Sequence, residues 1–330
     1  MSSDNQGSVT RRSFIKASAG VMLVSGLGIP RTLQAGNAKG LATMIDLDRC
    51  DGCLNFDEPR CVASCRDRNL EIVPEPVSPM PKLFPRGMTE DWSKKKDVTS
   101  RLTPYNFICL QRADVEYQGE RKTIFIPRRC MHCNNPACAT ICPFAANHKY
   151  ENGAVVIDYD LCFGGAKCRT VCPWQIPQRQ SGVGIYLKII PTLAGNGVMY
   201  KCDLCNDLIH EGKIPACIDA CPKDAMAIGP YKEIMKAAEK RAGEMKGFIY
   251  GMTENGGTGT FYVSPVPFDI LNEAIDKGPG RPHLGPVKRA MEAMGTLEKS
   301  VVFSPVIGLA AGIAAVCAAV AKRKGDGQNG

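Results

Sequence analysis

The stretch from Cys130 to Pro173 holds two cysteine runs, CMHCNNPACATICP at 130–143 and CFGGAKCRTVCP at 162–173. Each run ends with two cysteines separated by three residues and followed by proline. An iron–sulfur cube takes four thiolates from different directions, and in paired runs the last cysteine ligates the neighbouring cube. The stretch therefore predicts two adjacent iron–sulfur sites that exchange a ligand.

Two further cysteine runs flank this pair. The first is Cys50-x2-Cys53-x7-Cys61-x3-Cys65, and the last is Cys202-x2-Cys205-x11-Cys217-x3-Cys221. The pattern Pro-Ala-Cys-x3-Cys-Pro occurs at both 136–143 and 215–222, so the chain contains an internal repeat. We expect an inner unit at about 127–180 from the second and third runs, and an outer unit from 44–70 and 198–230.

Exchange of the last cysteine between paired runs assigns a ligand group to each site. Each group is named here by its first cysteine. The predicted groups are Cys50, Cys53, Cys61 and Cys221 (the Cys50 site); Cys130, Cys133, Cys138 and Cys172 (the Cys130 site); Cys162, Cys168 and Cys142 (the Cys162 site); and Cys202, Cys205, Cys217 and Cys65 (the Cys202 site).

The Cys162 site is one ligand short. The segment IDLDRCDGC at 45–53 aligns with IDYDLCFGG at 157–165, which maps Cys53 onto Gly165. A cube that loses one protein ligand commonly loses that iron, so we expect a [3Fe–4S] cluster here and [4Fe–4S] clusters at the other three sites. The alternative is four [4Fe–4S] clusters, with water or a group other than cysteine on the fourth iron at this site.

Other uses of cysteine fit the sequence less well. The chain has 17 cysteines, and an odd number argues against a full disulfide framework. Zinc sites also use Cys-x2-Cys pairs and stay a rival, whereas no Cys-x2-Cys-His motif for c-type haem occurs. His132 is expected to support or pack beside the cysteines, and Cys109, which has no cysteine neighbours, is expected to be a buried core thiol.

The chain ends carry targeting signals. Thr10-Arg11-Arg12-Ser13-Phe14-Ile15-Lys16 and the apolar run after it predict a twin-arginine signal segment at 1–38, with possible cleavage after Ala35 or Ala38. Residues 301–321 carry no charge and predict a transmembrane helix. Because positive residues stay on the cytoplasmic side, the basic segment 322–330 is predicted to be a cytoplasmic tail, with the rest of the chain outside. Much of the net charge of +8 lies at these ends, so no nucleic-acid surface is predicted.

Between the cysteine runs the pattern predicts mixed secondary structure. We expect strands at 44–49, 153–159 and 261–263, helices at 230–245 and 266–276, and a hairpin from 106–117 and 121–126. The proline-rich, charged segment 71–101 is expected to be irregular, either lining a partner subunit or covering the domain.

The four runs, the degenerate third run and the two terminal segments together resemble the iron–sulfur (beta) electron-transfer subunits of the dimethyl-sulfoxide-reductase superfamily. In layout the chain is similar to the ferredoxin-type subunits of periplasmic hydrogenase-2-type [NiFe] hydrogenase and of formate dehydrogenase N. The resemblance implies an α+β, duplicated two-cluster ferredoxin-like fold with long loops over residues 39–296. It also implies electron relay between a catalytic oxidoreductase subunit and a membrane quinone-reactive or cytochrome subunit, at the periplasmic face of the bacterial cytoplasmic membrane.

Two other functions compete with this interpretation. One is a self-standing reductase that uses an open iron at the Gly165 site, and the other is a zinc-binding structural scaffold. The sequence contains no convincing nucleophile–base constellation and no dinucleotide-binding glycine motif in its required context. We therefore expect a non-catalytic electron-transfer subunit whose specificity resides in its partners.

Overall fold

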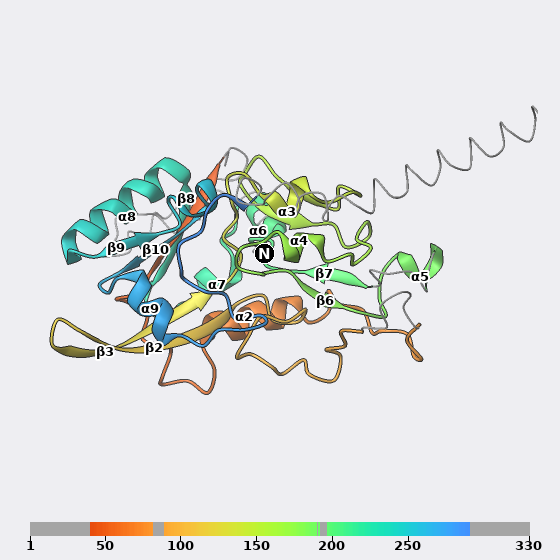
Figure 1. The fold of residues 1–330 in the computed structure, drawn as a ribbon, viewed down its shortest axis with the longest axis horizontal. Coiled ribbons are helices and arrows are strands. Elements are labelled where there is room, and N and C mark those ends of the chain that lie inside the picture. The colour runs from red at the N-terminus through yellow and green to blue at the C-terminus, as the bar shows by residue number, and fades with distance from the viewer. Residues whose placement is uncertain (1–39, 82–88, 190, 192–196, 291–330) are drawn as a thin grey trace, which may run out of the picture.

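The computed structural model describes residues 40–81, 89–189, 191 and 197–290, and Figure 1 shows their arrangement. The predicted signal segment at 1–38, transmembrane helix at 301–321 and tail at 322–330 lie outside these residues. None of the helices in the described part is both long and apolar enough to cross a bilayer.

A four-stranded sheet joins the two ends of the described residues. Its order is β8 (Met226–Pro230), β1 (Leu41–Asp46), β10 (Thr260–Ser264) and β9 (Phe248–Tyr250). Strand β1 pairs in parallel with β10, through registers such as Thr43 with Thr260, and antiparallel with β8. The strand predicted at 261–263 is confirmed, whereas the one predicted at 44–49 lies slightly earlier, because the chain turns after Asp46 toward the first cysteine run.

Helix α8 (Tyr231–Met245) covers one face of this sheet, as Figure 1 shows. Its buried side chains Ile234, Ala238 and Ala242 pack against Met44 of β1 and Phe261 of β10. Because strand side chains alternate between faces, Ile45 and Tyr262 point the other way and join the main core with the cysteines. The helix predicted at 230–245 is confirmed. It packs on the face of the sheet opposite to the face that joins the cysteine-containing core.

A long hairpin forms from β2 (Cys109–Tyr117) and β3 (Glu120–Arg128), which confirms the predicted hairpin. Gln118 and Gly119 have φ of 55° and 79°, the left-handed pair that a tight two-residue hairpin turn needs. Cys109 is fully buried, as predicted. Burial raises the pKa of its thiol to about 12.

The remaining elements are short, and all but η1 and α9 lie within or between the cysteine runs. The strand predicted at 153–159 is confirmed as the shorter β5, and the helix predicted at 266–276 as α9. These elements are α2 (Arg60–Asn69), α3 (Ala137–Thr140), β4 (Asn147–Lys149), β5 (Val155–Ile157), α4 (Lys167–Thr170), β6 (Gln178–Gln180), α5 (Tyr186–Ile189), β7 (Val198–Tyr200), α6 (Asn206–His210), α7 (Ala216–Asp219), η1 (Glu254–Gly256) and α9 (Phe268–Ala274).

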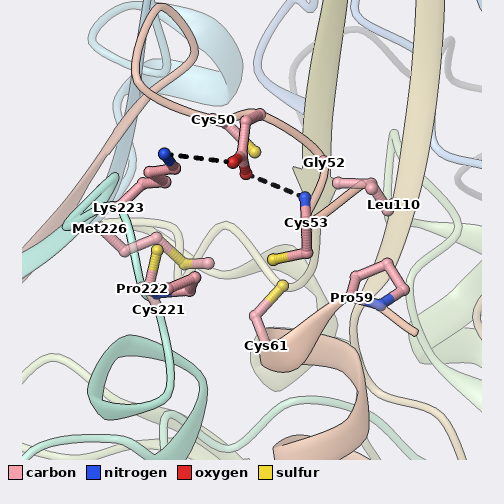
Figure 2. Close-up of a pocket in the computed structure, with 11 residues that line it drawn as sticks. Cys50, Gly52, Cys53, Pro59, Cys61, Leu110, Cys221, Pro222, Lys223 and Met226 are labelled. Atoms are coloured by element: carbon pink, nitrogen blue, oxygen red, sulfur yellow. Dashed lines mark hydrogen bonds and ion pairs between the residues drawn. The ribbon is translucent and has the colours of Figure 1, made fainter. Parts of the chain in front are cut away.

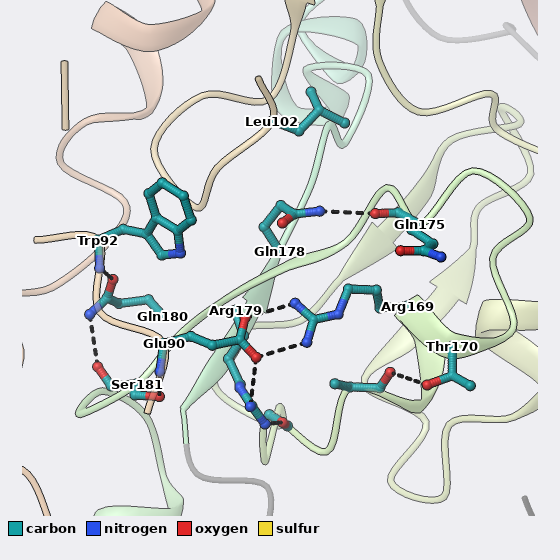
Figure 3. A network of polar contacts seen from close by, with 12 residues as sticks. Glu90, Trp92, Leu102, Arg169, Thr170, Gln175, Gln178, Arg179, Gln180 and Ser181 are labelled. Carbon is teal, nitrogen blue, oxygen red and sulfur yellow. Dashed lines mark hydrogen bonds and ion pairs between the residues drawn. The ribbon is translucent and has the colours of Figure 1, made fainter. Parts of the chain in front are cut away.

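The segment 71–101 is irregular where it is described, as predicted, and it is fastened to the inner unit (Figure 3). Nη1 and Nη2 of Arg169 each donate to an oxygen of the Glu90 carboxylate at 2.7 Å, and Arg179 Nη2 donates to it at 2.6 Å. The Trp92 backbone N–H donates to Gln180 Oε1 at 2.8 Å. Burial alone would raise the pKa of Glu90, but the two guanidiniums outweigh it and lower that pKa. This segment therefore covers the domain near Cys168.

Candidate iron–sulfur cluster sites

All four cysteine runs begin with a similar backbone turn, although its fourth residue is left-handed only in the first and last runs, with φ of 55° at Cys53 and 50° at Cys205. The third residue of each turn is left-handed, with φ of 69° at Gly52, 46° at His132, 66° at Gly164 and 65° at Leu204. This turn aims a backbone N–H at the first sulfur: the N–H groups of Gly164 and Leu204 lie 3.4 Å from the sulfurs of Cys162 and Cys202. The third run keeps the left-handed third residue although it lacks the second cysteine, which aligns Gly164 with Gly52 and hence the next residue, Gly165, with Cys53.

The third cysteine of every run also has a fixed place. Cys61, Cys138, Cys168 and Cys217 are each the second residue of a short helix, in α2, α3, α4 and α7 respectively. Proline precedes three of these helices, and Ala166, with φ of 57°, precedes the fourth. The unequal gaps within the runs are therefore loops of different length between two fixed placements, and the wide gap before Cys61 does not displace its thiol.

At the Cys50 site, four thiols surround one pocket (Figure 2). Cys50, Cys53, Cys61 and Cys221 line a space of about 310 Å³, and their sulfurs point into it. Burial is the largest cause that raises the pKa of Cys50, to about 12. Asp51 lies at the rim, where its carboxylate pairs with Lys223 at 3.5 Å and accepts the Cys53 N–H at 2.9 Å.

Two further pockets repeat this arrangement. One, of about 310 Å³, is lined by Cys130, Cys133, Cys138 and Cys172, and the other, of about 300 Å³, by Cys65, Cys202, Cys205 and Cys217. Each of the three pockets takes its fourth thiol from another run, which is the grouping that ligand exchange predicts. Three pockets, each lined by four thiols, fit one kind of group bound three times.

The Cys162 site brings together three thiols. Burial is the main cause that raises the pKa of Cys168, and the charges of Cys138, Cys162 and Cys142 add to it. Cys142 likewise adds to the effect of burial on the pKa of Cys162. A Cβ placed on Gly165 would meet no atom within 4 Å, so the position of the missing ligand is open space.

The four sites follow one another in a fixed order. Cys61 of the Cys50 site interacts electrostatically with Cys217 of the Cys202 site, and burial together with that charge raises its pKa well above the usual value. Burial raises the pKa of Cys202 to about 11; Arg129 opposes this, and Cys130 of the next site adds to it. Cys168 in turn lies near Cys138. The order is Cys50 site, Cys202 site, Cys130 site, Cys162 site.

Polar side chains also reach the sulfurs. Asn69 Nδ2 lies 3.4 Å from the Cys65 sulfur, and Asn255 Nδ2 lies 3.3 Å from the Cys133 sulfur. His132 Nδ1 accepts the Val155 N–H at 3.0 Å, so the proton of the neutral ring is on Nε2, which lies 3.5 Å from the Cys202 sulfur. Burial, with Lys201 and Arg129 nearby, lowers the pKa of His132. His132 thus supports a cysteine, as predicted from sequence.

The sequence interpretation did not identify two buried cations among these cysteines. Arg129 and Lys201 are 1% and 3% exposed. Burial alone would lower the pKa of Lys201, but the thiolates of Cys130, Cys138 and Cys202 outweigh it and raise that pKa. The signal in the sequence was their position, because each directly precedes the first cysteine of a run.

The residues present fit iron–sulfur clusters. In the described part of the chain, no three His, Cys, Asp or Glu side chains are gathered as tightly as a single metal ion requires, and the thiols stand instead around shared pockets. Backbone N–H groups and amides point at the sulfurs, an arrangement that tunes clusters. Ligation by the individual cysteines is part of the proposal below.

Comparison with known proteins agrees with this geometry. Residues 121–231 match the model of a 4Fe-4S dicluster domain, and residues 49–146 match a second model with the same description. Two dicluster domains correspond to four clusters. The fold and sites therefore define a duplicated, ferredoxin-like iron–sulfur protein.

Its relatives are components and operon proteins of redox enzymes. The sequence is 30% identical over 192 residues to the B component of anaerobic dimethyl sulfoxide reductase from Escherichia coli K12, covering 58% of this chain and 74% of that one. It is 27% identical over 304 residues to hydrogenase-2 operon protein HybA of Escherichia coli O157:H7, covering 80% and 83%. It is 28% identical over 214 residues to the B component of sulfite dehydrogenase from Allochromatium vinosum, covering 62% and 75%. This protein belongs to the iron–sulfur electron-transfer subunits of the dimethyl-sulfoxide-reductase superfamily.

Proposed function

We propose that this chain is a membrane-anchored, periplasm-facing subunit that relays single electrons between a catalytic oxidoreductase subunit and a membrane quinone-reactive or cytochrome subunit. The observation that carries the proposal is the unbroken order of four cysteine sites within one folded body. When bound, iron–sulfur clusters supply one-electron transfer. The protein's part is to hold the thiolates, space the sites and keep water away from them.

The cysteines act as ligands in the four groups that ligand exchange between the runs predicts. Cys50, Cys53, Cys61 and Cys221 hold one [4Fe–4S] cluster; the Cys202 and Cys130 groups hold two more. Cys142, Cys162 and Cys168 hold a [3Fe–4S] cluster, because Gly165 offers no thiolate where Cys53 stands in the first run. Support for this comes from the shared turn and from the open space beside Gly165.

The two ends of the order are suited to partners. Leu54 and Phe56, next to the Cys50 site, are 72% and 48% exposed. Beyond the Cys162 site, Phe144 is 52% exposed and stacks on Phe163 at 4.4 Å between ring centroids. Exposed apolar side chains grouped beside a site are typical of surfaces that another protein covers. We place the catalytic subunit at one end and the membrane subunit at the other.

The terminal sequences support the proposed location. Arg11 and Arg12 direct export of the folded protein by the twin-arginine route, and residues 301–321 anchor it with the basic tail in the cytoplasm. We expect the full chain to stay with membranes after alkaline carbonate extraction. Release into the soluble fraction by that wash would contradict the anchor.

Iron content with EPR, on anaerobically purified full-length protein before and after dithionite reduction, tests the function. We expect about 15 iron atoms per chain, an oxidised-state signal typical of [3Fe–4S], and new signals on reduction. About 16 iron atoms without the oxidised-state signal would contradict the three-iron cluster and keep the relay. Zinc in place of iron would overturn the proposed function.

A further inference from the structure

Two buried cations lie between the two sites in the middle of the order, the Cys202 site and the Cys130 site. These two are called the inner sites below, and the Cys50 and Cys162 sites are called the outer sites. Arg129 directly precedes Cys130, yet it lines the pocket of the Cys202 site. Lys201 directly precedes Cys202, yet it lines the pocket of the Cys130 site. Each of these two runs thus contributes its leading cation to the site that the other run begins, whereas their last cysteines, Cys142 and Cys221, go to the Cys162 site and the Cys50 site.

The cations are buried without a carboxylate partner at ion-pair distance among the described residues. Lys201 Nζ donates to the backbone carbonyls of Val155 and Cys202. Arg129 donates to Thr43 Oγ1 at 2.6 Å, its Nη1 lies 3.9 Å from the Cys202 sulfur, and its Nε has no hydrogen-bond partner. A buried cation without a compensating charge is strongly unfavourable, so negative charge must compensate it.

The thiols are the negative groups that these cations face. Lys201 interacts electrostatically with Cys130, Cys138 and Cys202, and less with Asp203. Arg129 interacts first with Cys202 and Cys217. Both sets are ligand groups of the proposed clusters, so the compensating charge is that of a thiolate-bound cluster.

The outer sites lack this feature. Arg49, which precedes Cys50, pairs with the Asp46 carboxylate at 3.4 Å. Leu161, which precedes Cys162, is 47% exposed. Within the described residues, a buried, carboxylate-free cation in front of the first cysteine is therefore specific to the two inner sites.

We propose that Lys201 and Arg129 set reduction potentials, Lys201 raising that of the cluster at the Cys130 site and Arg129 that of the cluster at the Cys202 site. This inference rests on the proposed function. Reduction adds one negative charge to a cluster, and a fixed positive charge in a dry interior favours the more negative form. The two inner clusters are thereby easier to reduce than the same clusters without their cations.

An EPR-monitored redox titration of the full-length protein, with the midpoint potential of each component as the readout, tests this. In Lys201→Gln one component shifts to lower potential, and in Arg129→Gln a different component shifts. The double variant shifts both. The charge-keeping variants Lys201→Arg and Arg129→Lys stay near the wild type, and Lys213→Gln, which removes an exposed lysine, changes nothing.

Two companion variants assign the components to sites. Asn69→Ala removes a donor to Cys65 and moves the same component as Arg129→Gln, whereas Asn255→Ala removes a donor to Cys133 and moves the same component as Lys201→Gln. Both shifts are smaller, because an amide carries no net charge. If Asn69→Ala instead moves the component that Lys201→Gln moves, the assignment of Arg129 to the Cys202 site and of Lys201 to the Cys130 site is wrong.

Iron is measured for every variant. Full iron with unchanged potentials in Lys201→Gln and Arg129→Gln overturns the inference, as does a shift of one shared component in both. Loss of iron even from Lys201→Arg and Arg129→Lys also overturns it, because the cations would then serve assembly. A wild type without reducible clusters is a separate result, and it refutes the proposed function itself.

Discussion

The first and third cysteine runs are built on one plan, and three of their differences are instructive. Both follow an Ile-Asp-x-Asp segment and share the left-handed glycine, with φ of 69° at Gly52 and 66° at Gly164. The first run has Cys53 where the third has Gly165. Its loop before Cys61 is longer, and Arg66 pairs with Glu58 of that same loop, at 2.6 Å from Nη2 to Oε2. In the third run, Arg169 pairs with Glu90 from the distant segment 71–101.

This comparison distinguishes two roles. The turn directs a backbone N–H at the first sulfur, and the second cysteine adds a thiolate to the site. The turn survives without that cysteine, so the backbone and its N–H bond to the first sulfur do not depend on a fourth ligand. What changes is the number of thiolates in the site. Substitutions that remove or exchange features of the two runs test this separation, beginning with the largest expected change.

Cys168→Ala should abolish the cluster at the Cys162 site. Only Cys142 and Cys162 of the predicted group would remain, and two thiolates do not hold a cluster. We expect about three iron atoms fewer per chain and no oxidised-state signal, measured by metal analysis and EPR. Cys109→Ala removes a buried thiol outside the runs and is the matched control; its iron content should equal that of the wild type. Unchanged iron in Cys168→Ala would refute the ligand role.

Cys53→Gly should give the first run the ligand pattern of the third. We expect about one iron atom fewer per chain and a second oxidised-state signal typical of three-iron clusters, recorded on the unreduced protein. Loss of the entire cluster would show that the first run needs Cys53 for more than one iron. That outcome would break the equivalence of the two runs.

Gly165→Cys should make the reciprocal change. The new Cβ meets no atom within 4 Å, so the thiol can be added at little steric cost. We expect a gain of about one iron atom and loss of the oxidised-state signal. Gly165→Ala adds the Cβ without the thiol and should keep that signal. If Gly165→Cys also keeps it, the side chain at 165 does not face the cluster.

Glu90→Gln should loosen segment 71–101 while leaving the iron content unchanged. Hydrogen bonds to charged groups contribute about 2 kcal/mol, which corresponds to roughly 30-fold easier local opening. The readout is the rate at which trypsin cuts at Lys94 to Lys96. Glu75→Gln, which removes an exposed partner of Lys96, is the control and should change that rate little. Equal rates in both variants would mean that Glu90 does not fasten the segment.

The sequence predicts local features of this protein well because they depend on spacing. The hairpin turn at Gln118 and Gly119, helix α8 and the grouping of thiols into three pockets all follow from patterns within one or two segments. The parallel pairing of β1 with β10 was not predicted, because it joins residues such as Thr43 and Thr260 that only the complete fold brings together.

The burial of charged side chains was the other feature that the sequence pattern did not predict. Arg129 and Lys201 look like ordinary exposed cations in the sequence, because burial of a charge depends on which opposite charges the fold places around it. The fastening of segment 71–101 through Glu90 was missed for the same reason: its partners, Arg169 and Arg179, are 79 and 89 positions away. Ligation itself stays a prediction until metal is measured.

The pairing of β1 with β10 has a consequence for synthesis and export. Strand β1 begins at Leu41, directly after the predicted signal segment, and its parallel partner is completed only at Ser264. During translation, the predicted export signal is therefore followed by a strand whose β10 side stays unpaired until nearly the whole domain has left the ribosome. Strand β1 can therefore complete its pairing only after all four cysteine runs have been synthesised, and we expect this pairing to delay folding of the domain until its cluster sites can form.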